Sequence, residues 1–137
     1  MNGMVNARLI CMMALLIGMT ACEQYTEPTP VERESVTFDG RLERAGVFVG
    51  TFPVKNAGAV RVLLNSLVGA DTNITAVGGL AVGTWNGSTC SLVVKNENAT
   101  FSTVVSGSAV VGDYCVQLYD VGKFSEAVNY SMEVQHP

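Results

Sequence analysis

Few residues in this chain could move protons, and their positions argue against an active site. The one histidine, His136, is the next-to-last residue, where chains usually fray. Asp113 and Asp120 are the best candidates for a general acid and base, yet both lie close to a glycine in an expected turn. Aspartate at such positions commonly caps backbone amides. We therefore predict that the protein is not an enzyme.

Acidic residues in expected turns form a candidate calcium site. Carboxylate oxygens are the hard ligands that Ca²⁺ prefers, and the candidates are Asp71, Glu97, Asp113 and Asp120. The alternative is that each is a solvated turn residue. A zinc site is not expected, because two thiols and one histidine do not supply the four ligands of a tetrahedral site. We therefore expect no cofactor, and calcium is the one alternative.

Two aromatic residues are the candidates for ligand binding. Trp85, the single tryptophan, lies between an expected strand and the turn at 86–88, where sugar-binding modules place rings that stack on pyranoses. Tyr119 falls on the polar face of its expected strand and could join it. The alternative is that Trp85 caps one end of the core near Cys90.

The four cysteines divide by position. Cys11 lies in an apolar N-terminal segment and Cys22 directly follows that segment, which leaves Cys90 and Cys115. Two cysteines in an exported domain predict one disulfide, Cys90–Cys115. The sequence has no Cys-x-x-Cys spacing that would favour a redox-active pair.

Residues 1–21 are predicted to be a signal peptide. Arg8 precedes an apolar run from Leu9 to Met19, which is too short to cross a bilayer but suits an export signal. Met19-Thr20-Ala21-Cys22 resembles the lipobox of bacterial lipoproteins, which implies that Cys22 carries lipid and anchors the protein in the membrane. The alternative is an ordinary leader cut after Ala21. Glu23, where an aspartate would favour the inner membrane, favours the outer membrane.

Charge and length limit the partners and the number of domains. The chain has 137 residues, with 8 Lys and Arg against 12 Asp and Glu, and this balance excludes an electrostatic nucleic-acid binder. Residues 22–34 contain two prolines and four glutamates without apolar periodicity, so we expect a flexible tether. The remaining residues, 35–137, allow one domain.

Strands are the elements expected to position these residues. Apolar and polar residues alternate most clearly over 128–135, and a period of two recurs at 36–38, 48–54, 60–64, 74–82, 92–94, 101–105 and 114–118. Turn-forming segments separate them at 55–58, 69–73, 86–88, 95–98, 106–108 and 122–123. About eight strands without helical periodicity predict an all-β fold, an antiparallel β-sandwich.

The alternation leaves the location of the disulfide open. It puts Cys115 on the face opposite Tyr114, Val116 and Leu118, which are expected to face the core. Either the disulfide lies on an outer sheet face, or a bulge near residues 112–113 resets the register.

The last third of the sequence resembles the bacterial pre-peptidase C-terminal domain. Residues 112–120, Gly-Asp-Tyr-Cys-Val-Gln-Leu-Tyr-Asp, are similar to the G-x-Y-x-V-x-V-x-D strand of that family, and residues 130–134 to its closing Y-x-L-x-V strand. The resemblance implies a jelly-roll-like sandwich, usually a non-catalytic appendage, with relatives that bind collagen or polysaccharide.

Together these features predict a non-catalytic lipoprotein of the bacterial cell envelope. Its sandwich would serve as an interaction or adhesion module for an envelope protein or a glycan, held at the membrane through Cys22. The alternative function is a carbohydrate-binding module, with or without calcium, that uses Trp85 and Tyr119.

Overall fold

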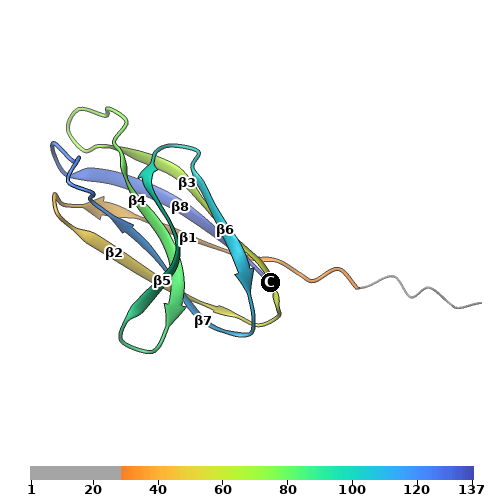
Figure 1. Cartoon of the computed structure of the whole chain (residues 1–137). Helices are drawn as coiled ribbons and strands as arrows, with labels where there is room; N and C mark the ends of the chain where they lie inside the picture. The colour runs from red at the N-terminus through yellow and green to blue at the C-terminus, as the bar shows by residue number, and fades with distance from the viewer. Residues whose placement is uncertain (1–28) are drawn as a thin grey trace, which may run out of the picture.

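The structure is a computed structural model that describes residues 29–137, so the predicted signal peptide and Cys22 lie outside the described residues. This part of the chain consists of eight strands (Figure 1). Their bounds are β1 Glu34–Leu42, β2 Val47–Val54, β3 Gly58–Gly69, β4 Gly78–Trp85, β5 Cys90–Ala99, β6 Val104–Ala109, β7 Gly112–Tyr119 and β8 Val128–His136. Over the same residues, no helix is long and apolar enough to cross a membrane.

The strands pair into two four-stranded antiparallel sheets. Sheet A has the order β1-β8-β3-β6 and sheet B the order β2-β7-β4-β5. The sheets face each other in two layers (Figure 1). The predicted all-β sandwich is therefore confirmed.

The core lies between the sheets and is built by the alternation seen in the sequence. On β7, Val116 and Leu118 point inward and are fully buried, while Asp113 and Gln117 point outward. On β8 the inward set runs from Val128 to Val134 at every second residue. Since one face of each sheet is apolar, a shift of one residue would expose the whole set, so the register is strongly specified.

Two predicted turns are instead strand. Residues 95–98 continue β5, and the Asn96 side chain accepts a hydrogen bond from the Asn98 N–H where the pairing with β4 shifts register. Polar residues there build a β-bulge rather than a turn. Residues 106–108 lie within β6, paired with β3. The actual turn between these strands is 100–103, which carries Phe101 out into solvent.

The expected strand over 74–82 is also shorter than predicted. β4 begins at Gly78, and residues 70–77 form a loop that pairs with β3 through one isolated bridge between Val68 and Thr75 and through backbone hydrogen bonds around it. Asn73 adopts a positive φ of 57° in this loop, which interrupts an extended chain.

The C-terminal residues are packed rather than frayed. His136 is the last residue of β8 and is 2% exposed, with its ring stacked on Phe52 at a centroid distance of 5.3 Å. The Pro137 carbonyl accepts a hydrogen bond from the Lys55 N–H. A strand paired on both sides leaves this histidine inside the structure, so the expectation of fraying is wrong.

Candidate binding face on sheet B

The outer faces of the two sheets differ in chemistry. On sheet A, the outward residues of β1 and β8 are all polar or charged: Ser35, Thr37, Asp39, Arg41, Asn129, Ser131, Glu133 and Gln135. On sheet B, the outward residues of the central region are mostly apolar or small, and we call the following set the B face: Val47, Val49, Thr51, Pro53, Gly79, Ala81, Gly83, Trp85, Cys90, Leu92, Lys95, Asp113, Cys115, Gln117 and Tyr119. Sheet B therefore presents an unusually apolar surface.

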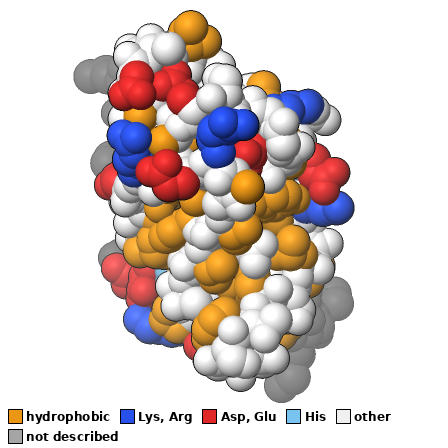
Figure 2. All heavy atoms as spheres, turned by 90° about the vertical axis from the view of Figure 1, so that its left-hand side faces the viewer, with side chains coloured by type: hydrophobic (Ala, Val, Ile, Leu, Met, Phe, Trp, Pro, Cys, Tyr) orange, Lys and Arg blue, Asp and Glu red, His pale blue; other side chains and the backbone are white. Residues whose placement is uncertain are grey.

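The large apolar side chains on the two edge strands of the B face are accessible. Val47 on β2 is 58% exposed and Leu92 on β5 is 42% exposed. Figure 2 shows hydrophobic side chains gathered across the middle of one side of the molecule, with charged side chains concentrated above them. Contiguous exposed apolar surface rimmed by polar groups is typical of a binding site.

Small residues on β4 leave the middle of the B face without large side chains of its own. Gly79, Ala81 and Gly83 occupy its three successive outward positions. A Cβ at Gly79 would lie 2.3 Å from the ring of Tyr119, so the ring lies directly over this glycine. The glycine thus allows an aromatic ring from β7 to cover the backbone of β4.

Trp85 lies at the end of β4, directly opposite Cys90 on β5. Its side chain is partly exposed and lines an open hollow of about 310 Å³ together with Thr51, Pro53 and Asp113. It does not belong to the core cluster of the described residues. The interpretation of Trp85 as a cap on the core is therefore wrong, and the ring lies on the outer surface.

Tyr119 is on the same face but at its other end. It pairs with Gly79, six residues along β4 from Trp85, so the backbone positions of the two residues are about 20 Å apart along the strands at 3.3 Å per residue. The Tyr119 hydroxyl donates to the Glu97 carboxylate at 3.5 Å. Burial and the nearby Glu97 charge raise the pKa of Tyr119, so it stays neutral at physiological pH. The two candidate rings share a face but cannot share one sugar ring.

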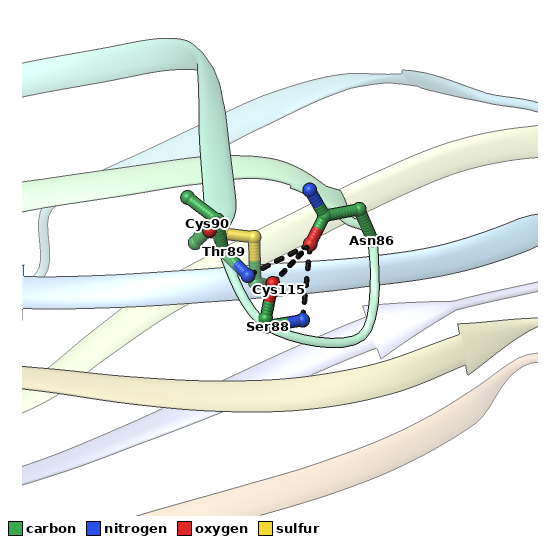
Figure 3. The surroundings of a disulfide bond; sticks show 5 residues. All are labelled: Asn86, Ser88, Thr89, Cys90 and Cys115. Atoms are coloured by element: carbon green, nitrogen blue, oxygen red, sulfur yellow. Dashed lines mark hydrogen bonds between the residues drawn. A yellow bond between two sulfur atoms is a disulfide. The ribbon is translucent and has the colours of Figure 1, made fainter.

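The predicted disulfide is present between Cys90 and Cys115, with an S–S distance of 2.01 Å and a Cα–Cα distance of 5.8 Å. Cys115 pairs with Thr51 and Gly83 in an uninterrupted β2–β7 register, and it is absent from the core cluster although fully buried. Of the two alternatives, the disulfide thus lies on the outer face. The adjacent turn is closed by Asn86, whose side-chain oxygen accepts from the Ser88 and Thr89 N–H groups (Figure 3).

The four calcium candidates are not gathered into one site. Within residues 29–137, no three His, Cys, Asp or Glu side chains lie close enough together to hold a metal ion. Glu97 is paired with Lys95 at 2.8 Å, and this hydrogen bond lowers the pKa of Glu97. Asp113 lies opposite Pro53 on the B face, and Asp71 is an exposed residue of the 70–77 loop.

Asp120 has a structural role. Its Oδ1 accepts hydrogen bonds from the N–H groups of Gly122, Lys123 and Phe124, and its Oδ2 accepts one from Ala45. Burial by itself would raise the pKa of Asp120, but the four donors outweigh it and lower the pKa. The carboxylate therefore joins the β1–β2 turn to the β7–β8 loop, as the capping alternative predicts.

Sequence reasoning missed a second carboxylate that fixes a loop. Glu126 accepts hydrogen bonds from the Asp71 N–H and from the Thr72 hydroxyl, and the Thr72 bond lowers the pKa of Glu126. A neighbouring hollow of about 200 Å³ is lined by the 70–77 loop and by residues 123–126. Because Glu126 and Thr72 are 54 residues apart, no local motif signals the contact.

Comparison with known proteins relates the chain to others by fold alone. No family model matches it, and no curated protein matches it. The crystal structure of the Yersinia pseudotuberculosis-derived mitogen is similar, with a TM-score of 0.56 at 13% identity, over 77% of this chain and 88% of the mitogen. Aeromonas hydrophila PliG, a periplasmic inhibitor of g-type lysozyme, is similar with a TM-score of 0.50 at 16% identity, over 73% of this chain and 83% of PliG. The chain shares the β-sandwich fold of these two proteins.

Proposed function

We propose that this chain is a non-catalytic, lipid-anchored protein of the cell envelope whose sandwich binds another protein through the B face. The observation that carries the proposal is the contrast between the outer face of β1 and β8, which is polar throughout, and the largely apolar B face. Both sheets bury their inner faces in the same core, so packing within the domain does not explain the contrast. A partner that covers the B face does.

The composition of the B face supports a protein partner. Val47, Val49 and Leu92 are each at least 40% exposed, and covering them removes apolar surface from water. The Lys95–Glu97 pair borders this region, and an apolar centre with a polar rim is the usual anatomy of a protein interface. Among proteins of similar fold, PliG is described as a lysozyme inhibitor, which also acts on a protein.

Site-specific photo-crosslinking in the native envelope tests this function. A photo-reactive phenylalanine analogue at Val49 reports on the B face, and the same analogue at Thr37 reports on the polar outer face of sheet A. We expect a discrete crosslinked product from position 49 and none from position 37. Adding Val47→Asp should abolish the product, since it puts a charge into the contact. Equal products from both positions, or none from position 49, would refute the proposal.

The proposed anchor has its own test. The lipobox resemblance implies a diacylglycerol thioether at Cys22, which mass spectrometry of the N-terminal peptide detects directly. An unmodified Cys22 with a free amine would reject the anchor while leaving the binding function of the B face unaffected.

A second candidate function is carbohydrate binding at Trp85. The partly exposed ring beside a hollow that Asp113 and Thr51 also line is an arrangement suited to stacking on one sugar and hydrogen bonding to its hydroxyls. Titration with peptidoglycan fragments and polysaccharides, with and without calcium, should shift the emission of this single tryptophan saturably. Tyr119→Phe, at the distant end of the face, is the matched control and should keep the shift. A Trp85 emission spectrum that no glycan changes would exclude this site.

A further inference from the structure

The four edge strands of the sandwich differ in how they are protected. β1 carries Glu34, Asp39 and Arg41, and β2 contains Pro53. β5 contains two bulges against β4 and carries the Lys95–Glu97 pair. Charges, proline and bulges are the devices by which edge strands avoid pairing with other chains. β6 has none of them: Val104–Ala109 is uncharged, and no charged residue occurs from 98 to 112.

The free edge of β6 has its hydrogen-bonding groups directed outward. β6 pairs only with β3, and Leu64 exchanges backbone hydrogen bonds with Ser102 and Thr103 just before the strand begins. Because antiparallel pairs alternate between bonded and non-bonded positions, Val105 and Gly107 bond to β3. The N–H and C=O groups of Val104, Ser106 and Ser108 then point away from it.

A groove runs along the same edge, between β6 and β5. One hollow of about 190 Å³ is lined mainly by apolar residues of both sheets, and its walls are Val60, Val82, Val93, Val94, Ala109 and Tyr114 with Gly107 and Ser108 beside them. A second, more open hollow of about 560 Å³ shares Val94 and continues past residues 95–98 and 104–106. β6 and β5 are edge strands of sheet A and sheet B, and they lie beside each other on the same side of the sandwich. The groove therefore extends over the length of β6.

We propose that the β6 edge binds an extended, uncharged peptide segment of a partner protein as an added β-strand. The segment pairs antiparallel or parallel with Val104–Ala109 through the outward backbone groups. Side chains of a strand alternate between its two faces, so an apolar residue at every second position enters the apolar hollow and a polar residue at the others faces water. An uncharged segment is favoured, because residues 98–112 carry no charge and the two charges that line the groove, Lys95 and Glu97, already pair with each other at 2.8 Å.

This site is separate from the B face on which the proposed function rests. The β6 edge belongs to sheet A, whereas Val47 and Val49 lie on β2 of sheet B. The proposal adds a second surface, with backbone pairing in place of apolar side-chain contact. A variant that disables one surface should leave the other intact.

Amide hydrogen exchange of the full ¹⁵N-labelled chain tests the site. The probe is a neutral seven-residue peptide of alternating threonine and valine with both ends blocked, added up to about 1 mM. We expect exchange of the Ser106 and Ser108 amides to slow at least tenfold, since they gain hydrogen-bond acceptors. Unchanged exchange at the highest concentration overturns the proposal, and so does protection confined to the β1 or β5 edges.

Ser106→Pro is the decisive variant. It removes the outward N–H but no bond to β3, and proline is tolerated at such edge positions. We expect it to abolish protection of Ser108 while circular dichroism stays unchanged, whereas the matched control Ser106→Thr keeps the response. If Ser106→Pro fails to fold, Ser108→Lys tests the same point through a charge on the edge. A full response from the variant that folds refutes the proposal.

Two further results would distinguish the β6 edge from the B face and from self-association. Val47→Asp should retain the peptide response although it abolishes crosslinking from position 49 on the B face, so the two proposals fail separately. Protection of Ser106 and Ser108 that rises with protein concentration, without peptide, would show that a second copy occupies the edge and would overturn the assignment to a partner peptide.

Discussion

Replacing Asp120 tests whether this carboxylate holds two loops together. Three of its four donors, from Ala45, Gly122 and Lys123, are in exposed turns where water can replace the carboxylate, so each contributes about 0.5 kcal/mol. The Phe124 N–H is partly buried and contributes about 1.5 kcal/mol. Asp120→Ala should therefore lower the free energy of unfolding by about 3 kcal/mol. Asp113→Ala, at an exposed position on β7, the strand that Asp120 directly follows, is the matched control and should have little effect.

Asp120→Asn separates the hydrogen bonds from the charge. The amide oxygen can keep the three donors at Oδ1, but the amide nitrogen then faces the Ala45 N–H, so the loss of that bond, about 0.5 kcal/mol, should remain together with the loss of the charge. The folded protein lowers the pKa of Asp120, so the charge contributes stability that is fully present above the ordinary pKa of about 3.9. That stability is lost as pH falls through the lowered pKa.

Urea unfolding at pH 7 and pH 3, followed by Trp85 emission and far-UV circular dichroism, measures these differences. The gap between wild type and Asp120→Asn should shrink at pH 3. An Asp120→Ala variant as stable as the Asp113→Ala control would refute the assignment of Asp120 as a link between the loops. A gap that widens at pH 3 would refute the direction of its pKa shift.

Three other changes test the B face and its supports. Reduction of Cys90–Cys115, which spans 25 residues, should lower the free energy of unfolding by about 3.5 kcal/mol through loop entropy, as measured by urea unfolding with and without dithiothreitol. A loss below about 1 kcal/mol would contradict that account. Gly79→Ala should lower the free energy of unfolding by about 2 kcal/mol, because the new methyl group meets the Tyr119 ring. In a double-mutant cycle, Tyr119→Ala should recover most of this loss. Additive effects of the two changes would exclude the contact. Trp85→Ala should shift the midpoint of thermal unfolding, followed by circular dichroism, by only a few degrees, since the ring is outside the core; a shift typical of a core aromatic would disprove this.

Strand content was predictable because it depends on a local pattern. β8 alternates over its whole length between buried and partly exposed residues, and the sequence shows the same alternation directly. The turns at Asn86-Gly87 and at Gly122 were predictable too, since both glycines adopt a positive φ. The turns predicted at 95–98 and 106–108 were wrong because polar and small residues occur in bulges and edge strands as readily as in turns.

The candidate site was predictable only in part. The alternation placed Trp85 near a strand end and Tyr119 on an outward face, and the structure puts both on the B face. Their separation, and the contrast between the two outer faces, depend on which strands are neighbours. Strand order arises from contacts between distant segments, so no local pattern encodes it. Whether Asp120 binds backbone amides or a metal depended in the same way on Ala45, 75 residues away.

The position of β8 determines when the domain can be completed during synthesis. β8 is the last strand in the sequence, yet it lies between β1 and β3 in the middle of sheet A (Figure 1). Sheet A therefore cannot assemble in its final order until residues 128–136 have left the ribosome. Until then β1 has no partner in sheet A, and one edge of β3 is unpaired. The same residues that complete the core also close the gap in sheet A, so loss of β8 would remove the partner of two strands at once.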